Sequence, residues 1–395
     1  MVPAYRQSFN ASWSEARYES LHTTLEKRSG APLGFHLSET PCFYSRSLMN
    51  ELARLGAELV EQSLTGDAGR AGADVVPDRY RGPGAGGRPA FLCVDFGLVR
   101  AEDGTIQPRL VELQAFASLF GFQLAVAEAY RDAYQLPSSL GFFIDESLNH
   151  DSYQRLLATH LVGDHDAQEV VLLEIQPKHQ KTWPDFVATE ALWGVRAIDT
   201  GDVEVEGRKL FYRRDGRRLQ IKRIYNRVIP DELEKKKVQL PFDYREDYDV
   251  EWLGHPAWYF RVSKFSIPWL THPCVPRTWY LNELDRLPAD RDNYLLKPLF
   301  SFAGGGITFA PTDEEIAAIP VADRRNYILQ ERIHFTPVID TPHGATQSEI
   351  RVMYIWTDRL RALLPLIRMG RGKMMGVDYN KGLRWVGASA GFIVN

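Results

Sequence analysis

The sequence predicts an α/β (α+β) protein, because strand-like and helix-like segments alternate along most of the chain. Three stretches carry this prediction. Residues 168–198 have the pattern of a buried strand, a helix and a second strand. Residues 90–114 have the pattern of two strands joined by a turn at Glu102, Asp103 and Gly104. Residues 293–333 have the pattern of a strand, a glycine-rich loop, a short helix and a further strand.

The bulk composition is that of a globular protein of enzyme size. The 395 residues are enough for two or three subdomains with cores of their own. Hydrophobic residues make up 44% and charged residues 25%, which is ordinary for such proteins. A net charge of −4 lacks the basic footprint of a nucleic-acid-binding protein. No apolar run approaches the length of about 18 residues that a membrane span needs. We therefore expect neither nucleic acid nor membrane as a partner.

The three cysteines, Cys42, Cys93 and Cys274, are far apart and lack C-x-x-C spacing. They predict neither a disulfide framework nor a zinc site, and a reducing compartment fits them best. The N-terminal stretch has no apolar segment of the signal-peptide type. These observations predict a cytoplasmic protein and leave its oligomeric state open.

The first 89 residues predict a helical region followed by a Gly/Pro-rich connection. Residues 11–26 and 45–63 have helical spacing, as in the series Leu48, Leu52 and Leu55. Residues 67–89 are rich in glycine, proline, arginine and alanine, which is typical of an irregular connection. This region carries no recognisable chemistry. Further helices are predicted over residues 115–134, 230–245 and 278–284.

The hairpin predicted for residues 90–114 places acidic and amide side chains close together. Glu112 and Gln114 are two residues apart on a strand, so both point to the same face. The partner strand can bring Asp95 near them. Two carboxylates and an amide oxygen form a hard-oxygen set that suits Mg²⁺. The alternative is a half-exposed hairpin with solvated acids.

A lysine and a glycine-rich loop follow another strand-like run. Lys297 comes directly after the apolar residues 294–296, and Pro298 follows it. Glycines let backbone N–H groups approach an anion closely, and the ammonium group adds a point charge, which suits a nucleotide phosphate tail. No G-K-[ST] sequence closes the loop, so it is not a Walker A motif. The alternative is an ordinary hairpin beside a solvated lysine. The loop residues predicted to line the phosphate site are Ser301, Ala303, Gly304, Gly305 and Gly306.

The next strand-like run, residues 327–333, turns polar at Gln330 and Glu331. The order of lysine strand, glycine loop, helix and polar-ended strand resembles the ATP-grasp superfamily. In that family the lysine and the loop hold the phosphates, and the backbone of the second strand reads the adenine. The resemblance implies that Gln330, Glu331 and Ile333 contact the base. Lys264 resembles the earlier of the two lysines that the family places on the nucleotide.

The order of the motifs resembles the circularly permuted ATP-grasp proteins, which include the synthetase domain of glutathionylspermidine synthase. The family binds the magnesium of MgATP through an acidic residue and an E-x-N pair, usually after the glycine loop. Here the corresponding D…E-x-Q set precedes the loop. The resemblance extends from about residue 91 to the C-terminus and implies Asp95, Glu112 and Gln114 as metal ligands. Gln114 stands where the family has Asn, so either the metal geometry differs or that ligand is lost.

The continuous apolar run at residues 168–177 predicts a strand that is buried on both faces. With the helix and strand that follow, it resembles the Rossmann-like domain that precedes the ATP-grasp core. Asn226 and Arg227 end another strand-like run, where the arginine could clamp a carboxylate or form a structural ion pair. The predicted domains are the helical region 1–89, the metal-site hairpin and core helices 90–165, the Rossmann-like domain 166–230 and the nucleotide-binding lobes 231–395.

Four cationic residues near the C-terminus are the candidate catalytic groups. Arg351 lies within the otherwise apolar run 349–356, where a charge needs a partner. The family resemblance implies that this arginine faces the transferred phosphoryl group, and the alternative is a salt bridge to Glu349. Arg368, Arg371 and Lys373 lead into a glycine-containing loop that would hold an acyl phosphate or an acceptor carboxylate. The alternative for this segment is a solvated surface loop.

These residues together predict an ATP-dependent ligase that joins a carboxylate to an amine or a thiol. Its cofactors would be ATP and Mg²⁺, and its partners would be small-molecule or peptide carboxylate and amine substrates. Phosphoryl transfer needs positioning and charge neutralisation more than covalent catalysis, which matches the residue types. Two alternatives remain open: a phosphotransferase that acts on a small molecule, and a non-catalytic nucleotide-binding protein.

Overall fold

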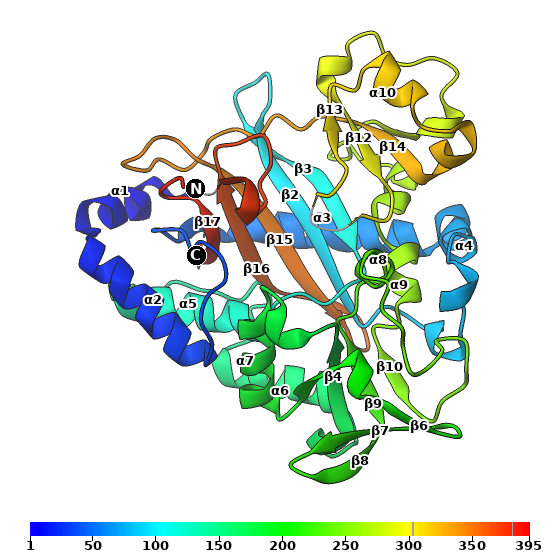
Figure 1. Ribbon diagram of the computed structural model, residues 1–395. Coiled ribbons are helices and arrows are strands. Elements are labelled where there is room, and N and C mark those ends of the chain that lie inside the picture. The colour runs from blue at the N-terminus through cyan, green and yellow to red at the C-terminus, as the bar shows by residue number, and fades with distance from the viewer. Residues whose placement is uncertain (302–303, 381) are drawn as a thin grey trace.

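The computed structural model describes residues 1–301, 304–380 and 382–395, and it contains four β-sheets with helices packed around them (Figure 1). The predicted α/β (α+β) class is confirmed. Ala303, which was predicted to line the phosphate site, lies outside the described residues. No helix of the described part of the chain is both long enough and apolar enough to cross a membrane.

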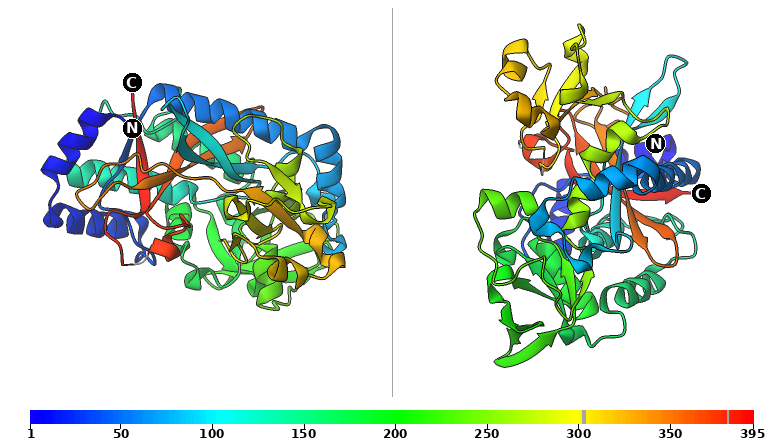
Figure 2. Two further views of the ribbon diagram at one scale, coloured as in Figure 1. Left: turned by 90° about the horizontal axis from the view of Figure 1, so that it is seen from above. Right: turned by 90° about the vertical axis from the view of Figure 1, so that its right-hand side faces the viewer.

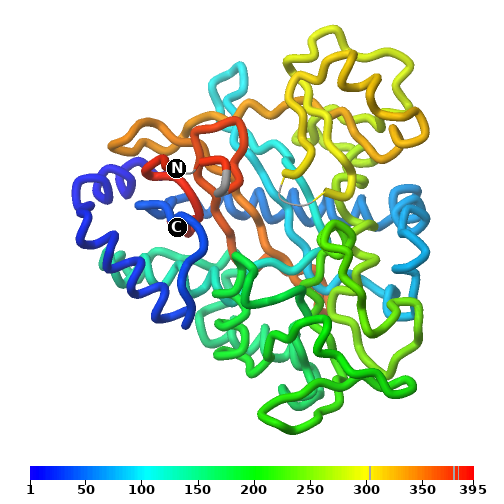
Figure 3. Tube along the Cα trace, in the orientation of Figure 1, coloured from blue at the N-terminus to red at the C-terminus, as the bar shows by residue number. Residues whose placement is uncertain are grey.

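The central sheet has six strands from distant parts of the chain. Their order is β1 (Cys42–Ser45), β17 (Gly387–Val394), β16 (Leu360–Gly370), β15 (Gln347–Trp356), β2 (Phe91–Arg100) and β3 (Ile106–Gln114). Only β1 and β17 pair in parallel; the other neighbours are antiparallel. The C-terminal strands, orange to red in Figure 3, therefore lie beside the cyan hairpin β2–β3.

Helices cover both faces of the central sheet. Along β2, Leu92 and Val94 share a core with α3 (Arg46–Leu64), whereas Phe91 and Cys93 share a second core with α5 (Phe120–Tyr134). This alternation follows from the two-residue period of a strand. The predicted N-terminal helical region is present as α1 (Pro3–Ser12), α2 (Glu15–Ser29) and α3, whereas α4 (Gly66–Asp74) forms where an irregular connection was predicted. Helix α5 begins later than the predicted residue 115.

The second sheet is parallel and confirms the predicted β-α-β pattern. Strand β4 is buried along its whole length, as its continuous apolar run requires. The sheet order is β10 (Glu251–Leu253), β9 (Arg223–Asn226), β4 (Val170–Glu174) and β5 (Arg196–Asp199). Helix α7 (Trp183–Trp193) connects β4 to β5, and α6 (His150–Val162) packs on α7. A three-stranded sheet extends this layer through β6 (Glu204–Glu206), β7 (Lys209–Arg214) and β8 (Arg217–Ile221).

A small antiparallel lobe carries the lysine and the glycine loop. Its strand order is β11 (Thr278–Tyr280), β14 (Tyr327–Glu331), β12 (Tyr294–Pro298) and β13 (Thr308–Phe309), with the short helix α10 (Asp313–Ala317). Figure 2 shows this yellow lobe and the green parallel sheet at opposite ends of the central sheet. The helix α9 (Ala257–Arg261) and the 3₁₀ segment η6 (Lys264–Trp269) precede the lobe.

Two helical predictions hold only in part, through α8 (Pro230–Lys235) and the 3₁₀ segment η7 (Leu281–Glu283). Residues 278–284 were expected to be helical, but Thr278, Trp279 and Tyr280 form β11, because these β-branched and aromatic residues pair with β14. Residues 230–245 were expected to form a helix, but α8 (Pro230–Lys235) ends early. Lys237 takes a left-handed backbone conformation with φ of 51°, which a helix cannot continue. The predicted domain boundaries stay a prediction.

Candidate functional site

The central sheet aligns charged side chains from four strands on one face. Asp95 on β2 is the register partner of both Arg351 on β15 and Glu112 on β3. Glu349, two residues before Arg351, is the partner of Arg368 on β16. Residues that are opposite one another, or two apart, share a face of a sheet. The strand register therefore brings together side chains that lie far apart in the sequence.

Arg351 is held by three side chains. Its Nε and Nη2 donate to the two carboxylate oxygens of Asp95 at 2.6 and 2.7 Å, and Nη1 donates to Ser118 Oγ at 3.1 Å. The Gln114 amide is assigned with its oxygen toward the guanidinium, where it accepts from Nη1 and Nη2 at 3.2 and 3.1 Å. An arginine has five N–H donors, and these contacts use all five. These contacts hold Arg351 in a network of protein side chains, and its predicted phosphoryl-facing role stays a prediction.

Arg368 extends this network and keeps unused donors. Its Nη2 donates to Asp95 and lies 2.6 Å from the carboxylate of Glu349. Its Nε has no partner among the described residues, and its side chain is 24% exposed. The alternative partner predicted for Arg351, Glu349, is thus paired with Arg368 instead.

The pKa values of the two acids reflect this pairing. Burial disfavours the charged form of Asp95, but Arg351 and Arg368 outweigh it and hold the pKa below its usual value. Burial raises the pKa of Glu349, which Arg368 only partly offsets. The same contacts raise the pKa of Arg351 against the effect of burial, so its charge is permanent.

The two predicted lysines reach the same place from different elements. Lys264, at the start of η6, donates from Nζ to Glu112 Oε1 at 3.2 Å and to the backbone oxygen of Ser301 at 2.7 Å. Lys297, on β12, is 6% exposed and donates to the amide oxygen of Gln330. Burial lowers the pKa of Lys297 to about 8; Glu112 opposes this shift and Lys264 adds to it. Two buried ammonium groups therefore influence each other at the start of the glycine loop.

The glycine loop has the backbone conformation that its glycines allow. Gly304 and Gly306 have φ of 73° and 74°, a region that other residues rarely adopt. A Cβ on Gly306 would lie 2.8 Å from the ring of Pro298, and a Cβ on Gly304 would lie 2.6 Å from Met374 Cε. Gly305 lies between them in the same turn. The loop therefore packs closely on the end of β12 and on the segment that follows β16.

The polar side chains of β14 bind other protein groups, and one of them accepts a hydrogen bond from Lys297. Gln330 is 1% exposed and links Lys297 to Thr278, to which its Nε2 donates at 3.3 Å. Glu331 is paired with Arg109 at 3.3 Å and with Arg277 at 3.5 Å. Ile333 follows the strand and is half-buried. Adenine contact by these three residues stays a prediction.

The predicted cationic loop after β16 reaches the glycine loop. Arg371 donates to Thr346 Oγ1 at 3.1 Å and to Thr341 Oγ1 at 3.3 Å. Lys373 is exposed, with its Nζ 5.8 Å from the ring centre of Phe309. With Met374 beside Gly304, this segment lies next to the phosphate site that the sequence predicts.

The predicted metal ligands are neighbours, but their oxygens face protein cations. Asp95 accepts from two arginines, Gln114 faces Arg351, and one oxygen of Glu112 accepts from Lys264. Among residues 1–301, 304–380 and 382–395, no group of three or more His, Cys, Asp or Glu side chains could hold a metal ion. The set does not fit Mg²⁺ as arranged, so Mg²⁺ binding by these residues stays a prediction.

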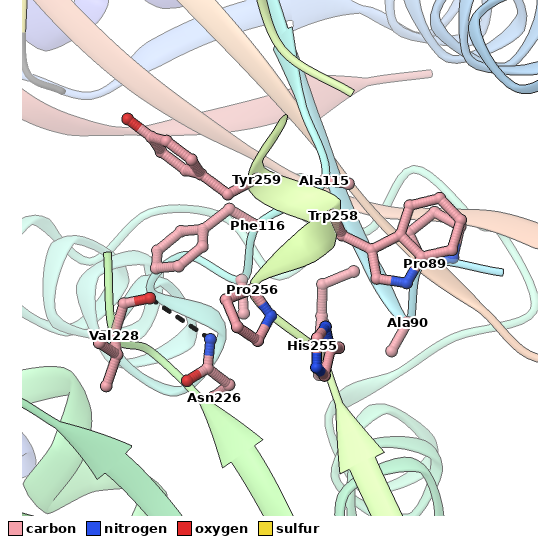
Figure 4. Close-up of a pocket in the computed structure, with 13 residues that line it drawn as sticks. Pro89, Ala90, Ala115, Phe116, Asn226, Val228, His255, Pro256, Trp258 and Tyr259 are labelled. Carbon is pink, nitrogen blue, oxygen red and sulfur yellow. Dashed lines mark hydrogen bonds between the residues drawn. The ribbon is translucent and has the colours of Figure 1, made fainter. Parts of the chain in front are cut away.

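The carboxyl ends of the parallel strands form a separate structural cluster. Arg227 pairs with the buried Asp185 at 2.7 Å, which is the ion-pair alternative rather than an open clamp. Asn226 donates to the backbone oxygen of Val228 at 3.3 Å beside a small cavity that is also lined by His255 and Trp258 (Figure 4). The cavity volume of about 10 Å³ holds no more than one water molecule. Burial lowers the pKa of His255 to about 4, so this imidazole is neutral.

Sequence reasoning missed Ser118 as a member of the site. Its only signal is a polar residue between apolar neighbours shortly after Gln114. The partnership of Glu349 with Arg368 depends on the register of β15 and β16, which no local pattern encodes.

The arrangement of a lysine strand, a glycine loop and a returning strand, set against a large sheet, defines an α+β, ATP-grasp-like fold. A solved structure shares the overall fold: a glutathione synthetase-like effector, GSS30, from Globodera pallida in its apo form. The TM-score is 0.58 with 12% sequence identity, and the alignment covers 96% of each chain. No protein-family model and no curated protein matches the sequence. The likeness therefore shows that the two chains share an overall fold and nothing finer.

Proposed function

We propose that this protein is an ATP-dependent ligase that joins a carboxylate to an amine or a thiol and releases ADP. One observation carries the proposal: Lys264 and Lys297 are both buried beside the glycine loop, each 6% exposed. Lys264 already shares Glu112, whereas Lys297 donates to the neutral amide of Gln330. Two buried like charges are costly unless an anion joins them. A nucleotide phosphate chain is the anion that we expect a protein of this fold to bind here.

The roles of the residues follow from their positions. Lys264, Lys297 and the backbone of Ser301 and the glycines would hold the phosphates. The backbone of β14 would contact the adenine base. Arg368 is better suited than Arg351 to meet the charge that develops on the transferred group, because Arg368 retains free donors and partial exposure. Arg371 and Lys373 belong to the segment whose Met374 lies beside Gly304, and they would bind the carboxylate substrate.

The proposed reaction has two steps. A carboxylate oxygen attacks the γ-phosphorus, the bond to the bridging oxygen breaks, and ADP leaves. The amine then attacks the acyl carbon of the acyl phosphate, its C–O bond breaks, and phosphate leaves while the amine proton passes to solvent. The protein's part is to position the groups and to neutralise charge. No step is assigned to Mg²⁺, because the residues predicted to bind it are engaged with arginines and a lysine.

A non-catalytic nucleotide-binding protein is the second candidate, and one observation favours it. Two of the three side chains predicted to bind the metal of MgATP, Asp95 and Gln114, contact Arg351, and the third, Glu112, accepts from Lys264. A binding protein would form no ADP with any pair of substrates. A phosphotransferase would instead release a stable phosphorylated product.

Calorimetric titration with ATP tests the nucleotide site. Lys297→Met removes the ammonium but keeps the length of the side chain, and we expect ATP affinity to fall about 10- to 100-fold, since hydrogen bonds to charged groups contribute about 1.5–3 kcal/mol. The matched control is Lys209→Met, which changes an exposed lysine on β7 and should leave the affinity unchanged. Equal affinity in all three proteins would remove the proposal.

A further inference from the structure

The guanidinium of Arg351 lies among the side chains whose spacing predicts a magnesium site. Asp95 binds it through both carboxylate oxygens at 2.6 and 2.7 Å, as an aspartate would hold a cation. Gln114 and Ser118 add their oxygens at 3.1–3.2 Å. The four oxygens that surround this guanidinium are hard-oxygen donors of the type that Mg²⁺ uses. Here they accept N–H bonds instead.

The environment leaves little attraction for a second cation. Arg368 also donates to Asp95, so any metal bound to that carboxylate would lie beside two guanidinium groups. Around the three acids Asp95, Glu112 and Glu349 are four cations, which are Arg351, Arg368, Lys264 and Lys297. With one cation more than it has acids, the cluster repels a divalent cation, whereas without Arg351 its charges would balance.

The amide at position 114 fits this arrangement. A glutamine has one methylene more than the asparagine of the E-x-N pattern, and its oxygen reaches both terminal nitrogens of Arg351. With that contact all five N–H donors of Arg351 are satisfied in a buried place, where an unpaired donor would be costly. The replacement of asparagine by Gln114 therefore explains how all N–H donors of Arg351 find an acceptor.

We propose that Arg351 takes the place of a metal cation in the set formed by Asp95, Gln114 and Ser118. The protein then binds no divalent cation at these residues, and the role of Gln114 and Ser118 is to position the arginine. Only the consequence for ATP rests on the proposed function: the phosphates would be neutralised by Lys264, Lys297 and Arg368, with no metal held by Asp95. The proposal concerns this one set of oxygens and no other metal contact of a nucleotide.

The test is titration with Mn²⁺ alone, followed by electron paramagnetic resonance and by thermal unfolding, in the absence of nucleotide. Wild-type protein should bind no Mn²⁺ at sub-millimolar concentrations and should show no shift in Tm. Arg351→Ala removes the guanidinium and frees Asp95 Oδ1 and the oxygens of Gln114 and Ser118, while Arg368 still donates to Asp95 Oδ2. We expect this variant to bind Mn²⁺ and to gain about 2 °C in Tm at saturating metal.

The matched control is Arg361→Ala. Arg361 lies on the same sheet and pairs with Asp145 at 2.6 Å and with Ser147 at 3.3 Å, but no predicted metal ligand is among its partners. Mn²⁺ should not stabilise this variant. If Arg351→Ala does not fold, the wild-type titration decides the matter on its own.

Each outcome has one meaning for the proposal. Stoichiometric Mn²⁺ binding by the wild type that is lost in Asp95→Asn would overturn the proposal. A folded Arg351→Ala variant that does not bind Mn²⁺ would also overturn it. Failure of the proposed function is distinguishable, because that failure would appear as absent ATP binding whatever the metal titration gives.

Discussion

At the scale of single residues, Lys297 is the side chain whose environment differs most from that of an ordinary lysine. Burial lowers its pKa to about 8 from the usual 10.5. Below pH 8 the lysine is charged in both the folded and the unfolded chain, and the folded state bears the cost of desolvation. Between pH 8 and 10.5 the folded chain has lost the proton while the unfolded chain still holds it. Stability contributed by this site therefore rises with pH across that window.

The rise of stability with pH at this site can be tested with a variant. Lys297→Met should be more stable than the wild type at pH 7 by at least about 1 kcal/mol, because it removes a buried charge that has no carboxylate partner within hydrogen-bond reach among the described residues. The difference should shrink as pH rises from 8 to 10.5. Urea denaturation at several pH values measures it. An exposed-site variant, Lys209→Met, should show no such trend, and a constant difference for Lys297→Met would contradict the pKa shift.

At the scale of elements, the glycine loop and the strands of the central sheet were predictable to different degrees. The strand, loop and returning strand around Lys297 follow from a local pattern of apolar residues and glycines. The strands β2 and β15 are also visible locally, but their pairing joins segments more than half the chain apart. That pairing depends on burial of both faces under α3 and α5, which is not a local property.

Gly306 provides a test of the glycine loop as an element. Gly306→Ala meets two obstacles, a φ of 74° and a Cβ that would lie 2.8 Å from Pro298. Gly216→Ala at the β7–β8 turn meets only the first, because its φ is 78° and no atom lies within 4 Å of its Cβ. We expect Gly306→Ala to weaken ATP binding about tenfold, since each left-handed residue costs about 1–2 kcal/mol and the close contact adds to it. Gly216→Ala should bind ATP as the wild type does. Equal ATP affinities of Gly306→Ala and Gly216→Ala would show that the glycine loop does not contribute to ATP binding.

At the scale of the whole molecule, one buried acid ties the parallel sheet to the central sheet. Asp185 on α7 accepts from the backbone N–H groups of Gly121 and Phe122 at 3.1 and 3.0 Å, at the start of α5. Its other oxygen accepts from Arg227 at the end of β9 at 2.7 Å. The acid thus stabilises a helix N-terminus and an ion pair together. It links the layer of α7 and β9 to α5, the helix that covers the central sheet (Figure 1).

Removal of this link should destabilise the protein strongly. Asp185→Ala leaves the Arg227 guanidinium, which is 4% exposed, without its carboxylate. We expect the free energy of unfolding to fall by about 3–5 kcal/mol, the usual result of breaking a buried pair from one side. Urea denaturation followed by tryptophan fluorescence measures it. The control Asp243→Ala breaks an exposed pair with Arg245 and should cost no more than about 1 kcal/mol. Similar losses in both variants would contradict the linking role.

Local patterns were enough to predict the class of the fold, the buried strand at β4, the hairpin β2–β3 and the loop after Lys297. Periodicity, turn residues and glycines can all be recognised in a short stretch of sequence. The sequence by itself also placed Asp95, Glu112, Gln114, Arg351 and Arg368 among the candidate residues. Only the tertiary structure decided which of them meet. The register of β15 against β2 and β16 sets Arg351 into the oxygens predicted for a metal and leaves Arg368 with free donors. The physical reason is that a charge buried in a sheet takes the partner that register brings opposite it, and register is fixed by packing of the whole sheet.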